Sequence, residues 1–152
     1  MVETALIRIL LLPLACCVTT LAIAASPAGC LAGYKQALLA GGFTGPIVCS
    51  RRNATFRLIG TTEGYGYRVY DYRYRYGPRE AAVMHGGQKI VILHNGTYVG
   101  QYALSPPPYV RMRIRGTRLI LRSGLKPPIR LDLAKHLPSG IFINGETDRL
   151  YR

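Results

Sequence analysis

The stretch VRMRIRGTRLILR, residues 110–122, alternates apolar and charged side chains on both sides of Gly116 and Thr117. Alternation with a period of two is the pattern of a strand with one buried face, and a glycine at the midpoint favours a tight two-residue turn. The stretch therefore predicts an antiparallel hairpin. The expected pairs on its inner face are Ile114 with Leu119, Met112 with Leu121 and Val110 with Ser123.

The outer face of this hairpin would carry five arginines with no acid among them. The expected pairs on this face are Arg115 with Arg118, Arg111 with Arg122 and Arg113 with Ile120. Like charges directly opposite one another destabilise a sheet, unless water and salt screen them or an anion bridges them. Arginine also suits bidentate contact with phosphate and carboxylate. We therefore take these five arginines as a candidate anion-binding face.

A second hairpin is predicted around Asn95-Gly96, which is a strong signal for a two-residue turn. The expected pairs are Leu93 with Tyr98, Ile92 with Val99 and Val91 with Gly100. Apolar residues then fall on both faces, so we expect this hairpin to lie at the centre of the fold. Gly100 within a strand indicates a bend or the close approach of another layer.

Turn signals divide the rest of the chain into further short segments that alternate with a period of two. The predicted strands cover 54–61, 65–76, 80–85, 88–94, 97–104, 109–115, 118–123, 129–133 and 141–151. Ahead of them, Leu31, Tyr34 and Leu38 have helical spacing, and Gly41-Gly42 ends the predicted helix. These elements predict an all-β domain, a small antiparallel β-barrel or sandwich of about eight strands with one short N-terminal helix.

The segment YRVYDYRYRYG, residues 67–77, concentrates five tyrosines and three arginines. The simpler interpretation is a strand whose tyrosines pack at the edge of the core. The alternative is a surface where rings stack on bases or sugars and arginines hold charges. A β-bulge near Val69-Tyr70 would bring the aromatic residues to one face. The candidate aromatic face is Tyr70, Tyr72, Tyr74 and Tyr76, and the neighbouring anion-binding candidates are Arg73 and Arg75.

The N-terminal segment ILLLPLACCVTTLAIAA, residues 9–25, is an apolar run without charge that ends in small residues. This is the pattern of a secretory signal peptide. We therefore predict a signal peptide at 1–25, a single β-rich domain at 26–152, and export to the periplasm or the extracellular space. The alternatives are an uncleaved membrane anchor and a lipoprotein modified at Cys30.

Two cysteines follow the predicted signal peptide, Cys30 and Cys49. An exported chain with an even number of cysteines usually pairs them. The bridge would close a loop of about 20 residues and would contribute roughly 3 kcal/mol to stability. No histidine, aspartate or glutamate lies between the two cysteines, so the sequence predicts neither a metal site nor a cofactor.

The formal net charge of +13 favours an anionic partner. Arginine supplies 16 of the 20 basic residues, although a GC-rich genome would also favour arginine codons. The expected partners are an anionic polymer, such as lipopolysaccharide, a teichoic-type polymer or nucleic acid, or an acidic protein surface. Association with an outer membrane or a cell wall is compatible with them.

Catalytic motifs are missing from the sequence, since His85, His94 and His136 fit neither HExxH nor a Cys–His arrangement, and no GxSxG is present. We therefore expect a non-enzymatic binding or structural protein of a bacterial envelope. The alternatives are a barrel that holds a small ligand, a dedicated nucleic-acid binder, and a hydrolase whose site is assembled from scattered His and Asp.

Overall fold

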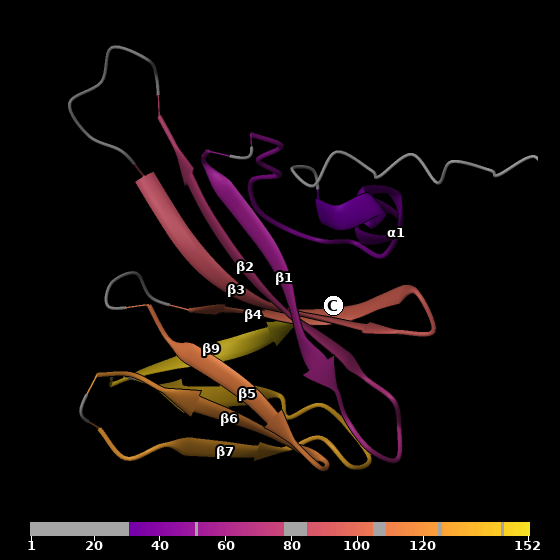
Figure 1. Cartoon of the computed structure of the whole chain (residues 1–152), viewed down its shortest axis with the longest axis vertical. Coiled ribbons are helices and arrows are strands. Elements are labelled where there is room, and N and C mark those ends of the chain that lie inside the picture. The colour runs from indigo at the N-terminus through magenta and orange to yellow at the C-terminus, as the bar shows by residue number, and fades with distance from the viewer. Residues whose placement is uncertain (1–30, 51, 78–84, 105–108, 125, 144) are drawn as a thin grey trace, which may run out of the picture.

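The computed structural model describes residues 31–50, 52–77, 85–104, 109–124, 126–143 and 145–152 (Figure 1). Within these ranges the chain is mostly β, with two antiparallel sheets and one short helix, as the sequence predicts. The strands are β1 (Ala54–Thr61), β2 (Arg68–Tyr76), β3 (His85–His94), β4 (Thr97–Leu104), β5 (Arg111–Arg115), β6 (Arg118–Arg122), β7 (Ile129–Asp132), β8 (Gly140–Ile143) and β9 (Glu146–Tyr151). The predicted strand at 80–85 falls almost wholly outside the described residues, and the predicted strand at 141–151 is two strands.

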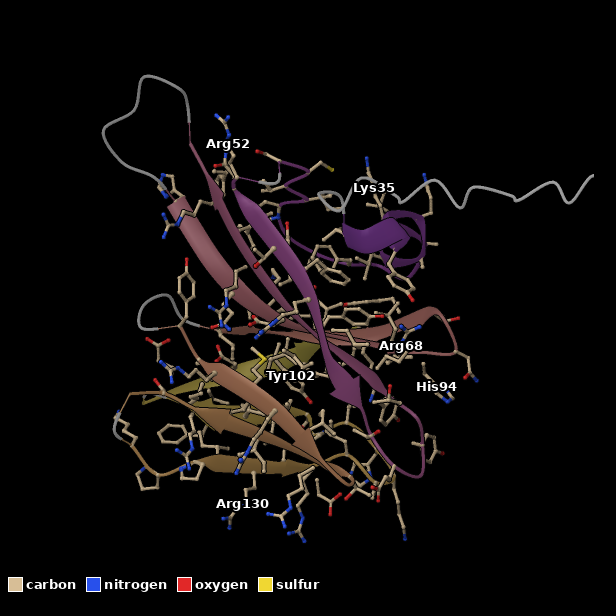
Figure 2. The ribbon with its side chains drawn as sticks, in the orientation of Figure 1. Lys35, Arg52, Arg68, His94, Tyr102 and Arg130 are labelled. Carbon is tan, nitrogen blue, oxygen red and sulfur yellow. The ribbon has the colours of Figure 1, made fainter. Side chains whose placement is uncertain are left out.

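The two sheets pack around a common core. The larger sheet has the strand order β1-β2-β3-β4-β9-β8, and the smaller sheet has the order β5-β6-β7. In Figure 1 the smaller sheet lies on one side of the larger sheet, and α1 (Lys35–Ala40) lies on the other. The main core cluster joins Val69 and Ile92 of the larger sheet to Leu119 of the smaller one. Tyr102 is fully buried and lies between the two sheets in Figure 2.

A second core cluster lies beneath α1, on the opposite face of the larger sheet. Leu38 of the helix packs there with Tyr72 and Leu93. Strands β2 and β3 are therefore buried on both faces, which explains why apolar residues occupy both faces of the central hairpin. A short 3₁₀ turn, Leu31–Gly33, precedes α1, and the helix ends at Gly41 as predicted.

The hairpin of β5 and β6 has the predicted register along its whole length. The observed pairs are Arg111–Arg122, Met112–Leu121, Arg113–Ile120, Ile114–Leu119 and Arg115–Arg118. Gly116 occupies the first turn position with a φ of 61°, a conformation that a glycine adopts without strain. The period-two pattern and one glycine were therefore sufficient to predict this hairpin.

The hairpin of β3 and β4 follows the predicted register only at its turn. Leu93 pairs with Tyr98 as expected, but the two predicted pairs beyond it are wrong. The observed pairs there are Ile92–Gly100 and Val91–Gln101. A β-bulge in β4 inserts one extra residue and shifts the register. Gly100 follows the bulge, where an added Cβ would lie 2.8 Å from the Leu150 side chain of β9, so a close approach does occur at this glycine.

Strand β2 is regular, which corrects the bulge predicted near Val69-Tyr70. It pairs residue by residue with β3, and the irregularity lies instead in the neighbouring strand β1, between Leu58 and Gly60. Tyr67 therefore faces the core between the sheets, whereas Tyr70 faces the core beneath α1. The prediction that all the aromatic residues of this segment share one face is wrong, because a regular strand alternates them.

The predicted signal peptide at 1–25 and Cys30 lie outside the described residues, so the domain division and the Cys30–Cys49 bridge stay predictions. Leu31 and Ile47, which are close in sequence to the two cysteines, pack in the same core cluster beneath α1. No helix of the described ranges is long and apolar enough to span a membrane.

Candidate anion-binding site

The predicted arginine face lies on the outer surface of the smaller sheet. Its inner surface carries Leu119 and Leu121, which are fully buried in the main core. Alternation along each strand then turns the arginines outward, and all five are exposed. They are Arg111, Arg113, Arg115, Arg118 and Arg122. The structure therefore brings together the five residues that the hairpin pattern predicted.

Strand β7 extends this face with two residues that the sequence argument did not place there. Arg130 pairs with Ile120, and Asp132 pairs with Arg118. Arg130 is a sixth arginine on the face, and Figure 2 shows it on the side of the smaller sheet that points away from the larger one. Asp132 contributes one acid to the surface, so the three-stranded face is not free of acids as the hairpin alone is.

A hollow of about 790 Å³ opens between the arginines near the β5–β6 turn. Its lining includes Arg113, Arg115, Arg118 and Arg130 together with Ile120, Thr117 and Glu63. Ile120 is only 5% exposed although it lies on the outer face. Arginine stems commonly cover apolar surface while their charged ends stay in water. We infer that the stems of the flanking Arg113 and Arg130 shield Ile120, with their guanidinium groups directed to the hollow. Arg111 and Arg122 lie beyond it.

Two acids lie near the hollow, and neither neutralises it. The backbone N–H of Glu63 donates to the carbonyl oxygen of Gly116 at 3.1 Å, which places this glutamate beside the turn. The Asp132 carboxylate accepts a hydrogen bond from the Ala134 N–H at 2.9 Å. Among the described residues, the arginines of this face form no ion pair, whereas Arg57 and Arg73 pair with Asp71 of the larger sheet. The face therefore keeps its positive charge available to an external anion.

Arg73 does not belong to this face, because Asp71 holds it elsewhere. The Arg73 guanidinium contacts the Asp71 carboxylate at 2.8 Å, and its carbon lies 4.9 Å from the ring centre of Tyr109. Asp71 is only 2% exposed and also accepts a hydrogen bond from Gln88 at 2.8 Å. A buried carboxylate requires such partners, so Arg73 serves the packing of the two sheets.

Arg75 lies at a separate place, at the far end of β2 from the arginine hollow. It lines a smaller hollow of about 220 Å³ together with Arg52, Arg73 and Tyr109. The seven arginines proposed as one anion-binding set are therefore divided. Five share the outer face of the smaller sheet, and the other two lie along β2.

The predicted aromatic face is mostly core. Tyr70 and Tyr72 are 2% and 0% exposed, whereas Tyr74 is half-buried and Tyr76 is 45% exposed. Burial, assisted by the neighbouring Tyr34, raises the pKa of Tyr70 to about 12. Burial also raises the pKa of Tyr72, whose hydroxyl donates to the carbonyl oxygen of Pro46 at 2.9 Å. The inner two rings therefore pack beneath the helix, and Tyr76 is the ring of this row most open to solvent.

The ring contacts of two histidines are with tyrosines. The ring contacts of His94 are with Tyr65 and Tyr67, and His85 stacks on Tyr76. The described part of the chain contains no group of three or more His, Cys, Asp or Glu that could hold a metal ion.

Comparison with known proteins adds no relative. No protein-family model matches the chain, and neither the curated proteins nor the solved structures contain a match. The function is therefore argued from the geometry and charge of the site alone.

Proposed function

We propose that this protein is an exported, non-enzymatic protein of a bacterial envelope that binds an anionic polymer through the outer face of its smaller sheet. The observation that carries the proposal is the set of six exposed arginines on that face, of which Arg115–Arg118 and Arg111–Arg122 are directly opposed pairs. Opposed like charges cost stability, and a bound anion removes this cost. An acidic protein surface would meet the same arginines.

The chemistry of the face fits a chain of anions better than a planar aromatic ligand. Its outward residues are the arginines, Asp132 and the shielded Ile120, and they include no aromatic ring. Guanidinium groups bind carboxylate, phosphate and sulfate through paired N–H donors. Contacts of this kind are made to the charged groups of a polymer and do not discriminate among its other groups.

The two-sheet architecture supports such a role by presenting the arginines on a rigid surface. We propose that the domain is a sandwich rather than a barrel, because its main core cluster lies between two sheets. The outer face of the smaller sheet is then free for a partner. The predicted signal peptide at 1–25 would place this face where envelope polymers occur.

The test is the salt dependence of binding to heparin, used as a model polyanion. The double variant Arg115→Gln/Arg118→Gln should bind more weakly, and the slope of log affinity against log salt should become shallower by about one to two units. The matched control is Lys35→Gln/Arg149→Gln, which removes the same charge from exposed residues on α1 and β9. Equal losses of affinity and slope in both double variants would leave only net charge as the cause and would refute the site.

A further inference from the structure

A second hollow, of about 320 Å³, lies beside the loop that joins β1 to β2. Figure 1 shows this loop at the same end of the molecule as the β5–β6 turn. Segments far apart in the sequence line the hollow: Tyr65, Tyr67, Val99, the run Lys135-His136-Leu137, and Arg152. It shares no residue with the arginine hollow.

One wall of this hollow is a supported aromatic ring. The rings of Tyr65 and Tyr67 stack with their centres 5.4 Å apart and their planes 17° apart. Tyr67 is 8% exposed, whereas Tyr65 is 50% exposed. The His94 ring, labelled in Figure 2, contacts both tyrosines, with ring centres 6.0 Å from Tyr65 and 5.7 Å from Tyr67. The exposed ring is therefore held from behind by other rings.

The loop that carries the two tyrosines is closed by its own hydrogen bonds. The Thr62 N–H donates to the carbonyl oxygen of Tyr67 at 2.9 Å, and the Tyr67 N–H donates to the Thr62 hydroxyl at 3.0 Å. Because the backbone is fixed at both ends of the loop, Tyr65 loses little further freedom when a ligand stacks on it. Preorganisation of this kind lowers the entropic cost of binding.

The remaining lining combines the cations Lys135 and Arg152 and an imidazole with an apolar floor. Lys135, His136 and Arg152 are exposed, while Leu137 is 6% exposed and Val99 is half-buried. The lining contains no aspartate or glutamate side chain. A hollow that pairs an exposed aromatic face with two cations suits a ligand that has a ring with an apolar face and also carries a negative group.

We propose that this hollow binds one pyranose ring of an acidic saccharide. The C–H face of the sugar would pack on Tyr65, its carboxylate or sulfate would meet the cations, and its hydroxyl groups would stay in water. A nucleobase could also stack, but its edge is normally read by amide and carboxylate groups, and the side chains of this lining include no Asn, Gln, Asp or Glu. The site shares no lining residue with the arginine hollow. The Gly116-Thr117 turn is nevertheless close to both, because its carbonyl oxygens accept hydrogen bonds from the N–H groups of Glu63 and Leu133, each two residues before a lining residue of this hollow.

The test is calorimetric titration of the protein with oligogalacturonate, with a neutral oligogalactoside and a nucleoside monophosphate as comparison ligands. We expect oligogalacturonate to bind most tightly. The variant Tyr65→Ala should weaken its binding between about two- and tenfold, the range measured for aromatic contacts. The matched control is Tyr76→Ala, which removes a tyrosine of similar exposure, 45%, from the other end of β2. This control should bind as the wild type does.

The alternative outcomes separate this site from the arginine face. Equal affinity of the Tyr65 and Tyr76 variants, or no binding of oligogalacturonate by the wild type, would overturn the proposal. Tighter binding of the nucleoside monophosphate would overturn the saccharide as ligand. Loss of heparin binding in Arg115→Gln/Arg118→Gln, with oligogalacturonate binding retained, would support two independent sites. If Arg115→Gln/Arg118→Gln retains heparin binding while Tyr65→Ala weakens oligogalacturonate binding, the result would support this site and refute the arginine face.

Discussion

The side chain of Gln88 forms two hydrogen bonds with the backbone of Val110. The Gln88 amide nitrogen donates to the Val110 carbonyl oxygen at 2.8 Å, and the Val110 N–H donates to the Gln88 amide oxygen at 2.7 Å. Both residues are buried, and the same amide nitrogen reaches Asp71. Gln88 thus acts as a peptide group would in a sheet, and it ties the start of β5 to the larger sheet.

Replacement of Gln88 by leucine should destabilise the protein. The change removes the hydrogen-bond partner of the buried Val110 N–H and one of the partners of Asp71, which keeps Arg73, so the free energy of unfolding should fall by about 2–4 kcal/mol. Urea denaturation measures it. The control Gln36→Leu changes an exposed glutamine on α1 and should be nearly neutral. Equal stabilities of the two variants would show that the pair is dispensable.

Removal of the Arg115–Arg118 repulsion should stabilise the protein when no ligand is present. The double variant Arg115→Gln/Arg118→Gln should have a slightly higher melting temperature at low salt. Its free energy of unfolding should rise by roughly a few tenths of a kcal/mol. The gain should shrink as salt is added, because salt screens exposed charges. Thermal unfolding at two salt concentrations measures both effects. A lower melting temperature for the variant at low salt would contradict the expected repulsion.

The buried tyrosines should make the fold sensitive to alkali. Burial raises the pKa of both Tyr70 and Tyr98 to about 12, from an ordinary value near 10. A raised pKa means that the folded state favours the neutral hydroxyl. The stability that this contributes is fully present below about pH 10 and is lost as the pH rises through about 12.

The substitution Tyr98→Phe should therefore make the alkaline loss of stability less steep between about pH 10 and about pH 12, because one buried hydroxyl no longer titrates. Denaturant midpoints at several pH values measure the slope. Phe142→Leu changes an exposed side chain that does not titrate and should leave the slope of the wild type unchanged. The same slope in all three proteins would argue against burial as the cause.

The Cys30–Cys49 bridge should be found by peptide mapping of protein recovered from an oxidising compartment under non-reducing conditions. Reduction should lower the free energy of unfolding by about 2–4 kcal/mol, since the bridge closes a loop of about 20 residues. Recovery of both cysteines as free thiols from that compartment would refute the bridge.

The hairpin of 110–122 could be predicted from the sequence because local features determine it. Its period of two, a central Gly116 and the short turn leave one register that buries the apolar side chains. The same pattern in IRLD, residues 129–132, could have extended the arginine face to Arg130 if the third strand had been placed beside the second. The alternation of this strand is a local feature, whereas its place beside β6 depends on the assembly of the sheet.

The remaining features depend on contacts between distant segments, which a local pattern does not contain. The β4 bulge occurs beside Gly100, where β9 passes close by. Arg73 is held by Asp71, whose burial follows from packing of the smaller sheet over β2. The hollow at Tyr65 joins residues from the β1–β2 loop, from β4 and from the stretch 135–152. Such relationships emerge only when the two sheets are assembled.

The shielded position of Ile120 has a kinetic consequence for the arginine face. The arginines around Ile120 are carried by the strands of a β-sheet, so the binding of an anion requires no rearrangement of the backbone. The rate of encounter should therefore be set by diffusion and by long-range attraction. Contacts that form this easily also break easily. A short anion would then stay only briefly, whereas a long polymer that loses one arginine pair would still be held by the next, and its residence would grow with its length.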